Sequence, residues 1–321
     1  MDAVLFVGHG SKDPDGNEEI RQFVAMLEPE LDVPIIETCF LEFERPDMLQ
    51  GLNTCVKRGA TRVAVIPIIL FSAGHAKIHI PAAIDEAREL HPHVQFIYGR
   101  PIGIHDEVIN ILTTRMNEAG FTSGEAHDDL AVLVIGRGSS DADANSDIYK
   151  MSRLFWERFK AKWVETAFMG VTYPLYEEGI ERCLKLGARH VVVLPYFLFT
   201  GVLIKRMSDQ LEQFRAKYPE AQFTMAEYFG FHPLLKDVLK DRVEEALHGE
   251  VKLNCDTCQY RLAAMEHIDH HHHHHHDDGH GHGHHHHHHH SHDHNHDHSH
   301  DHSHGHDHSH DHDRKHDHVT R

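Results

Sequence analysis

The stretch that decides the fold reads AVLFVGHGS at residues 3–11, and a close copy, AVLVIGRGS, follows at residues 131–139. The two copies are offset by 128 residues, and the same offset still holds where Lys77 matches Lys205. After one deleted residue the match continues toward the end of both copies. A repeat of this length indicates that most of the chain consists of two copies of one structural unit.

Within each copy, short runs of Val, Ile and Leu alternate with amphipathic stretches of helical length, which is the pattern of strands joined by crossover helices. In the first copy we expect strands near 3–8, 34–40, 62–70 and 94–98, and helices near 17–28, 47–58, 79–90 and 105–119. The apolar runs are continuous, which favours parallel strands covered on both faces. The predicted fold class is therefore α/β, with two tandem, duplicated, doubly wound domains that each hold a four-stranded parallel sheet.

The predicted organisation has four parts: domains at 1–125 and 126–250, a short segment at 251–265, and a tail at 266–321. The tail is almost entirely His, Asp, Ser and Gly, and it has no apolar residue between Ile268 and Val319. Such a composition cannot bury enough apolar surface to offset the entropy lost on ordering. We therefore expect the tail to be disordered.

The charge balance and the cysteines restrict the class of protein. The chain has 50 acidic residues against 31 Lys and Arg, so a phosphate backbone would be repelled and nucleic acid is excluded as a partner. The start of the chain lacks the features of a signal peptide, and no apolar stretch is long enough to cross a membrane, so we expect a cytoplasmic protein without membrane partners. Cys39, Cys55 and Cys183 lie in apolar surroundings and are predicted to be buried thiols.

Three reactive side chains follow the first three predicted strands of the first copy, namely His9, Glu42 and His75. Parallel strands place all their strand-to-helix loops at one edge of the sheet, so these residues can face one cleft. Two imidazoles and a carboxylate are ligands that a divalent late first-row metal ion prefers, and a neutral imidazole can also accept a proton. The pattern predicts a metal site that is also suited to proton transfer.

The second copy serves as an internal control for this prediction. The equivalents of the three reactive residues are Arg137, Gly170 and Leu203, whereas scaffold residues such as Pro67 keep their identity as Pro195. Packing or capping residues should have been retained in both copies, as their neighbours were. We therefore predict a functional role for His9, Glu42 and His75 as a set, with His79, whose equivalent is Met207, as a fourth candidate ligand.

Three segments carry a resemblance to a known family: GHGS at 8–11, FLEF at 40–43 and PIILFSAGH at 67–75. They resemble the sirohydrochlorin chelatases of the CbiX type, which belong to the class II tetrapyrrole chelatases, and the resemblance extends from residue 3 to about residue 247. It implies a chelatase-like fold for both halves and ATP-independent insertion of a metal ion into sirohydrochlorin. The metal would be cobalt on the way to cobalamin, or iron on the way to sirohaem. The family's two histidines and its acid correspond to His9, His75 and Glu42.

A mechanism for such a reaction follows from the residue types. His9 and His75 would hold the incoming ion while Glu42 or an imidazole accepts the protons that two pyrrole N–H groups must lose. The phosphate-binding motif GxxxxGK[ST] is absent, so no nucleotide is expected. A substrate with many carboxylates needs cations around the cleft, and the candidates are Lys12, Arg45, Lys77 and Arg137.

A CxxC pair, Cys255 and Cys258, precedes the tail. Two thiolates supply only half of a tetrahedral site, so a zinc ion or a cluster would need further ligands from a second subunit or from nearby histidines. Long members of the family carry a similar pair, preceded by Met, that is associated with an iron–sulfur centre; Leu253 stands in that place here. The resemblance thus implies an iron–sulfur cluster and a homodimer formed through this segment.

The tail carries unbroken runs of histidine at 270–276 and 284–290. Dense imidazoles bind divalent transition metals, so the tail is interpreted as a reservoir or a delivery arm for the active site, or equally as a metal buffer unconnected with catalysis. A non-enzymatic cobalt or nickel storage or chaperone protein is the alternative from another class, although it leaves the selective loss of the three reactive residues unexplained. Iron insertion remains the alternative reaction, and the tail favours cobalt.

Overall fold

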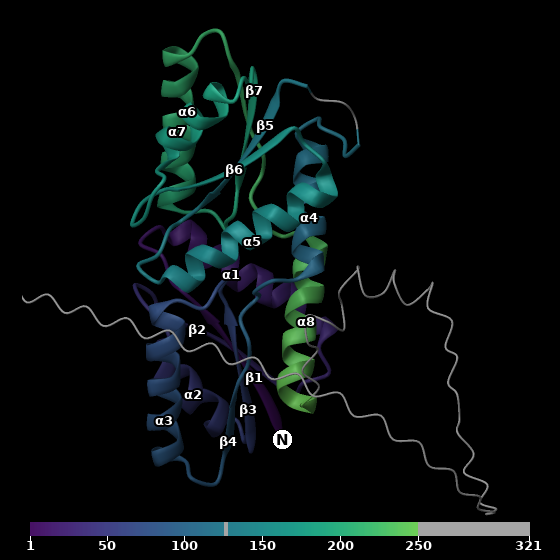
Figure 1. Cartoon of the computed structure of the whole chain (residues 1–321). Helices are drawn as coiled ribbons and strands as arrows, with labels where there is room; N and C mark the ends of the chain where they lie inside the picture. Colours follow the sequence, from purple (N-terminus) through teal and green to yellow (C-terminus); the bar gives the residue numbers. More distant parts are fainter. Residues whose placement is uncertain (125–127, 250–321) are drawn as a thin grey trace, which may run out of the picture. The chain divides into compact units, whose positions relative to one another are not determined.

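Two four-stranded parallel sheets form the framework of the protein (Figure 1). The computed structural model describes residues 1–124 and 128–249, apart from the side chain of His75. The first sheet has the order β2-β1-β3-β4, and the second repeats it as β6-β5-β7-β8. The strands are β1 (Asp2–Gly8), β2 (Ile35–Phe40), β3 (Arg62–Ile68), β4 (Gln95–Tyr98), β5 (Leu130–Gly136), β6 (Trp163–Phe168), β7 (His190–Pro195) and β8 (Gln222–Met225). The predicted α/β fold with duplicated parallel sheets is confirmed.

A helix follows each strand, as the alternating pattern predicts. The α-helices are α1 (Pro14–Leu27), α2 (Met48–Lys57), α3 (Ile80–Leu90), α4 (Asp106–Glu118), α5 (Ala142–Phe159), α6 (Tyr176–Lys185), α7 (Val202–Lys217) and α8 (Pro233–His248). Helix α1 begins where the Asp13 side chain accepts a hydrogen bond from the backbone N–H of Asp15, with Pro14 at the first helical position. This is a favourable start because the carboxylate satisfies a donor that has no partner inside the helix. Two short elements complete the first half: a 3₁₀ turn (Glu28–Glu30) and a π-helical turn (His75–His79).

The apolar side chains form three clusters, and one of them belongs to both halves. One face of the first sheet packs against α2 and α3, and the equivalent face of the second sheet packs against α6 and α7. The remaining faces of both sheets share a single cluster with α1, α4, α5 and α8, which includes Phe6 from β1 and Val134 from β5. The two halves are therefore joined through a continuous core.

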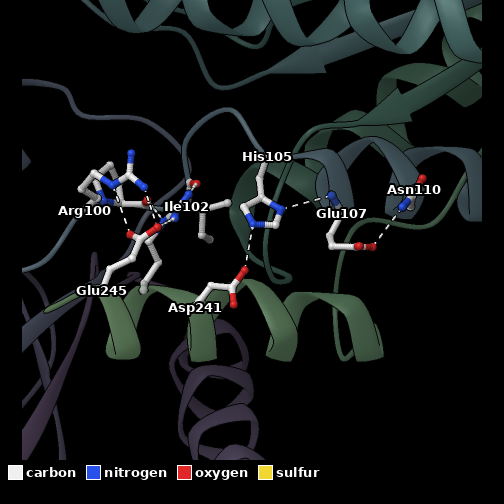
Figure 2. A network of polar contacts seen from close by, with 9 residues as sticks. Arg100, Ile102, His105, Glu107, Asn110, Asp241 and Glu245 are labelled. Atoms are coloured by element: carbon white, nitrogen blue, oxygen red, sulfur yellow. Dashed lines mark hydrogen bonds and ion pairs between the residues drawn. The ribbon is translucent and has the colours of Figure 1, made fainter. Parts of the chain in front are cut away.

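The last helix of each half contacts the sheet of the other half (Figure 1). Helix α8 packs on β3 and β4, and α4 contacts β7. A polar network fastens α8 to the first half: Arg242 donates to the carbonyls of Pro101 and Ile102 at 2.8 and 2.7 Å, and Glu245 accepts from both Arg242 and Arg100 (Figure 2). Because Arg242 and Glu245 are buried, their charges are tolerated only as a pair with these hydrogen bonds.

Cys39, Cys55 and Cys183 are buried free thiols, as predicted. Burial raises the pKa of Cys55 and of Cys183 to about 12 in each case, so both stay protonated and unreactive at neutral pH. None of the helices within residues 1–124 and 128–249 is long and apolar enough to cross a membrane. The predicted domain boundary at 125/126, the Cys255 and Cys258 pair and the histidine-rich tail lie outside the described residues.

Candidate active site

A cleft of about 480 Å³ opens beyond the carboxyl ends of the central strands of both sheets. The segments that follow β1, β3, β5 and β7 all contribute to its lining, so both halves form it. In each sheet the first strand lies between the second and the third. The chain therefore reverses its direction of winding between the first and third strands, and the cleft lies at the carboxyl ends of these strands. Ligands of doubly wound sheets bind at such points.

The walls of the cleft are mainly apolar, and its polar groups are few. Ile69, Leu70, Leu198, Phe199 and Val202 line it, and the ring of Phe71 stacks on that of Tyr196, with centroids 5.4 Å apart and planes 4° apart. The polar residues of the lining include His9, Ser11, Lys12, Arg137 and Asn145. This combination suits a ligand with a flat apolar body and acidic edge groups.

The turn after β1 brings the backbone of His9 against that of Glu42. The N–H groups of Leu41 and Glu42 donate to the carbonyls of Gly8 and His9, each at 3.0 Å. Gly10 has φ +84°, and a Cβ placed there would lie 1.7 Å from the carbonyl oxygen of Glu42, so only glycine allows this close approach. The structure thus places the backbones of His9 and Glu42 next to each other, at the same edge of the sheet.

The side chain of His9 contacts its counterpart in the second half. Its Nδ1 lies 3.2 Å from the carbonyl oxygen of Gly10, and its Nε2 lies 3.2 Å from Nη1 of Arg137. A guanidinium can only donate, so Nε2 accepts, and the ring is neutral with its proton on Nδ1. Arg137 therefore occupies the lone pair with which His9 would bind a metal ion.

The other proposed ligands lie on the turns that follow β2 and β3. Glu42 is half-buried, and His79 is exposed at the N-terminal end of α3. His75 begins the π-helical turn, but its side chain is outside the description. Among the side chains that are described, no group of three His, Cys, Asp or Glu residues could hold a metal ion. The ligand set His9, Glu42, His75 and His79 therefore stays a prediction.

The four predicted carboxylate-binding cations differ in their positions. Lys12 and Arg137 line the cleft, and the Lys12 ammonium lies 5.3 Å from the ring centroid of Phe43, which also lines it. Arg45 pairs with Asp47 and is not among the lining residues of the described chain. Lys77 is also absent from that lining, and it pairs with two aspartates of the second half.

The ion pairs of Lys77 belong to a reciprocal arrangement that the sequence pattern did not predict. Lys77 Nζ lies 2.7 Å from Asp141 and 3.0 Å from Asp143, which raises the pKa of this lysine. Its equivalent, Lys205, lies 2.7 Å from Asp13 and 2.8 Å from Asp15. The 128-residue offset relates every member of one set to a member of the other, so the repeat contains both sets but does not show that they pair across the two halves. The two sets link the halves in a pseudo-two-fold relation.

Comparison with known proteins agrees with this architecture. The CbiX family model matches the chain twice, at residues 3–119 and 131–246. A sirohydrochlorin cobaltochelatase from Priestia megaterium is 61% identical over 84% of this chain and 88% of its own length. A sirohydrochlorin ferrochelatase from the same organism is 38% identical over 78% of this chain and 92% of its own length.

A solved structure extends the agreement to three dimensions. The sirohydrochlorin chelatase SirB from Bacillus subtilis subspecies spizizenii, in complex with cobalt, superposes with a TM-score of 0.66 at 31% identity. The match covers 78% of this chain and 96% of that one. With the family model covering both halves and the duplicated parallel sheets in place, the chain belongs to the CbiX family.

Proposed function

We propose that the protein is a sirohydrochlorin cobaltochelatase, which inserts Co²⁺ into sirohydrochlorin without a nucleotide. The observation that carries the proposal is the cleft between the two halves, where apolar walls meet His9, Lys12 and Arg137. The 61% identity to a cobaltochelatase, against 38% to a ferrochelatase, supports cobalt as the metal. The reaction would serve cobalamin biosynthesis.

The cleft offers separate contacts to the two parts of such a substrate. Apolar side chains such as Leu70 and Val202 can cover the face of a flat macrocycle, and burying that face is favourable. Lys12 and Arg137 can pair with carboxylates at its edge, with Arg137 able to form two parallel hydrogen bonds. Arg45 and Lys77 remain candidates for this role only if substrate binding draws them away from Asp47, Asp141 and Asp143.

Insertion exchanges one metal ion for two protons. Two pyrrole N–H bonds break, two pyrrole nitrogens bind Co²⁺ in their place, and both protons leave. We assign His9 and His75 to hold the ion, with His79 as an additional ligand, and Glu42 to accept protons. Because Arg137 donates to His9 Nε2, a substrate carboxylate that attracts the guanidinium also frees the lone pair of His9 for the metal.

The assay that tests this function mixes the purified protein with sirohydrochlorin and either Co²⁺ or Fe²⁺, without oxygen, and follows tetrapyrrole absorbance. We expect both metals to be inserted, and Co²⁺ faster at equal free concentrations. Faster insertion of Fe²⁺ would instead identify an iron-inserting enzyme of sirohaem synthesis. Metal binding without any change in the tetrapyrrole spectrum would favour a storage or chaperone protein.

We propose separate roles for the segments that follow α8. Cys255 and Cys258 would bind an iron–sulfur cluster with ligands from a second copy of the chain, which makes the protein a homodimer. The tail at 266–321 would collect Co²⁺ and pass it to the cleft. We also keep the domain division at 125/126 and a cytoplasmic location as proposals, supported by the two separate family matches and by the buried free thiols.

Two shortened chains, ending at residues 265 and 250, test these roles. The chain ending at 265 keeps the cysteine pair, and we expect it to insert Co²⁺ at the full rate with ample metal but more slowly than the complete chain when metal is scarce. Equal rates under scarcity would contradict delivery by the tail. After anaerobic purification, iron and sulfide should be present in the chain ending at 265 and absent from the one ending at 250; their absence from both would exclude the cluster.

A further inference from the structure

The turn after the third strand is wound differently in the two halves. In the first half, His75–His79 forms a π-helical turn that leads into α3. In the second half, the equivalent residues belong to the regular α-helix α7, which begins at Val202. Single π turns within helices occur frequently at functional sites. The difference falls on the turn that carries His75 and His79, the proposed ligands whose equivalents are Leu203 and Met207.

Pro81 gives a physical reason for the irregular winding. Proline has no backbone N–H, so Pro81 cannot donate to the carbonyl of Lys77, four residues earlier, in an α-helical pattern, nor to that of Ala76, five residues earlier, in a π-helical pattern. Its ring also crowds the carbonyl four residues before it. The equivalent of Pro81 in the second half is Asp209, which lies inside α7 and has a normal backbone donor.

Tyr98 supplies a hydrogen bond to this turn from outside the helix. It is the last residue of β4, and its hydroxyl donates to the carbonyl oxygen of Ala76 at 2.7 Å. Burial raises the pKa of Tyr98 to about 12, so the hydroxyl keeps its proton at neutral pH. The equivalent residue in the second half is Met225, which has no hydroxyl to donate. The proline and the tyrosine thus occur together in one half and are both missing from the other.

The bond acts one residue away from the proposed metal ligand. Ala76 follows His75 directly, is 2% exposed and lines the cleft. Holding its carbonyl fixes the peptide between Ala76 and Lys77, the second peptide after His75, and so restricts the backbone of the turn. Without this hydrogen bond the turn would sample several conformations, and only some of them would place His75 correctly for the metal. The apparent metal affinity falls in proportion to the population of the correct conformation.

We propose that Tyr98 is a positioning residue for metal transfer: its hydroxyl holds the π-helical turn His75–His79 in the conformation that binds the incoming ion. Tyr98 does not touch the metal or the tetrapyrrole in this role. It acts through the backbone of Ala76, and Pro81 makes the outside donor necessary. The inference rests on the proposed function, because it takes His75 as a ligand of the metal that is inserted.

The test replaces Tyr98 with Phe, which removes the hydroxyl and keeps the ring. The full chain is assayed with sirohydrochlorin at Co²⁺ concentrations set by a metal buffer, so that metal bound to the tail does not alter the free concentration. Loss of one hydrogen bond of ordinary strength should raise the KM for Co²⁺ about 3- to 10-fold. The KM for sirohydrochlorin should stay unchanged, because the proposed tetrapyrrole contacts are made elsewhere in the cleft.

Tyr218→Phe is the matched control. This variant also loses only a hydroxyl, which in the wild type donates to Glu181 in the second half at 3.3 Å. Both of its KM values should equal those of the wild type. A Tyr98→Phe enzyme with an unchanged KM for Co²⁺, or with equal rises in both KM values, would overturn the positioning role. Failure of the wild type and the control to insert any metal would instead overturn the proposed function, so the two failures are distinguishable.

Discussion

Replacing His9 with Ala should lower kcat/KM for cobalt insertion by more than about 100-fold while the protein stays folded. Even the outer partners of metal ligands typically contribute 10- to 100-fold to metal affinity or activity, so a direct ligand should contribute more. The side chain of His9 is half-buried, and it contacts the carbonyl of Gly10 and the guanidinium of Arg137, both in loops outside the apolar core. Its loss should therefore change the free energy of unfolding by less than about 1 kcal/mol.

Absorbance of the tetrapyrrole measures the rate, and thermal unfolding checks the fold. His93→Ala is a suitable control because His93 is exposed and does not line the cleft, so its rate should match that of the wild type. Insertion by His9→Ala within a few-fold of the wild-type rate would remove the first histidine from the ligand set. It would also leave the loss of this residue from the second half without a functional reason.

The secondary structure could be predicted closely because the repeat and the apolar runs are both local in sequence. The strand expected at 34–40, for example, is β2 at Ile35–Phe40, and the helix expected at 47–58 is α2 at Met48–Lys57. The exchange of α4 and α8 between the halves could not be predicted in the same way. The periodicity of a helix shows which of its faces is apolar, but not which of two similar sheets that face will cover.

The site was predictable only in part, for the same reason. The contact between His9 and Arg137 and the pairing of Lys77 with Asp141 depend on how the two halves face each other. The repeat equated Lys77 with Lys205, yet an offset in sequence does not show that equivalent loops meet. Pro81 was a usable local signal, since a proline early in a helix that its duplicate lacks indicates an altered turn. The role of Tyr98 required the three-dimensional contact with Ala76.

Replacing Arg137 with Ala should have opposite effects on the two substrates. Without the guanidinium, the lone pair of His9 Nε2 loses this donor, so the metal no longer competes with the hydrogen bond from Arg137 and the KM for Co²⁺ should fall. The same change removes a cation from the edge of the cleft. A hydrogen bond between charged groups contributes about 1.5–3 kcal/mol, less where water screens it, so the KM for sirohydrochlorin should rise roughly 10-fold.

Arg153→Ala provides the comparison, because Arg153 is an exposed arginine that pairs with Glu157 and does not line the cleft. If arginine acted only through the long-range attraction between its positive charge and the acidic substrate, both variants would raise the KM for sirohydrochlorin. Neither variant would then change the KM for Co²⁺. Opposite shifts confined to Arg137→Ala would mean that one side chain links the two binding events. A substrate carboxylate that attracts Arg137 would then expose His9 to the metal only when the acceptor macrocycle is already in the cleft. Equal KM values for wild type and Arg137→Ala would show that the contact with His9 takes no part in either binding event.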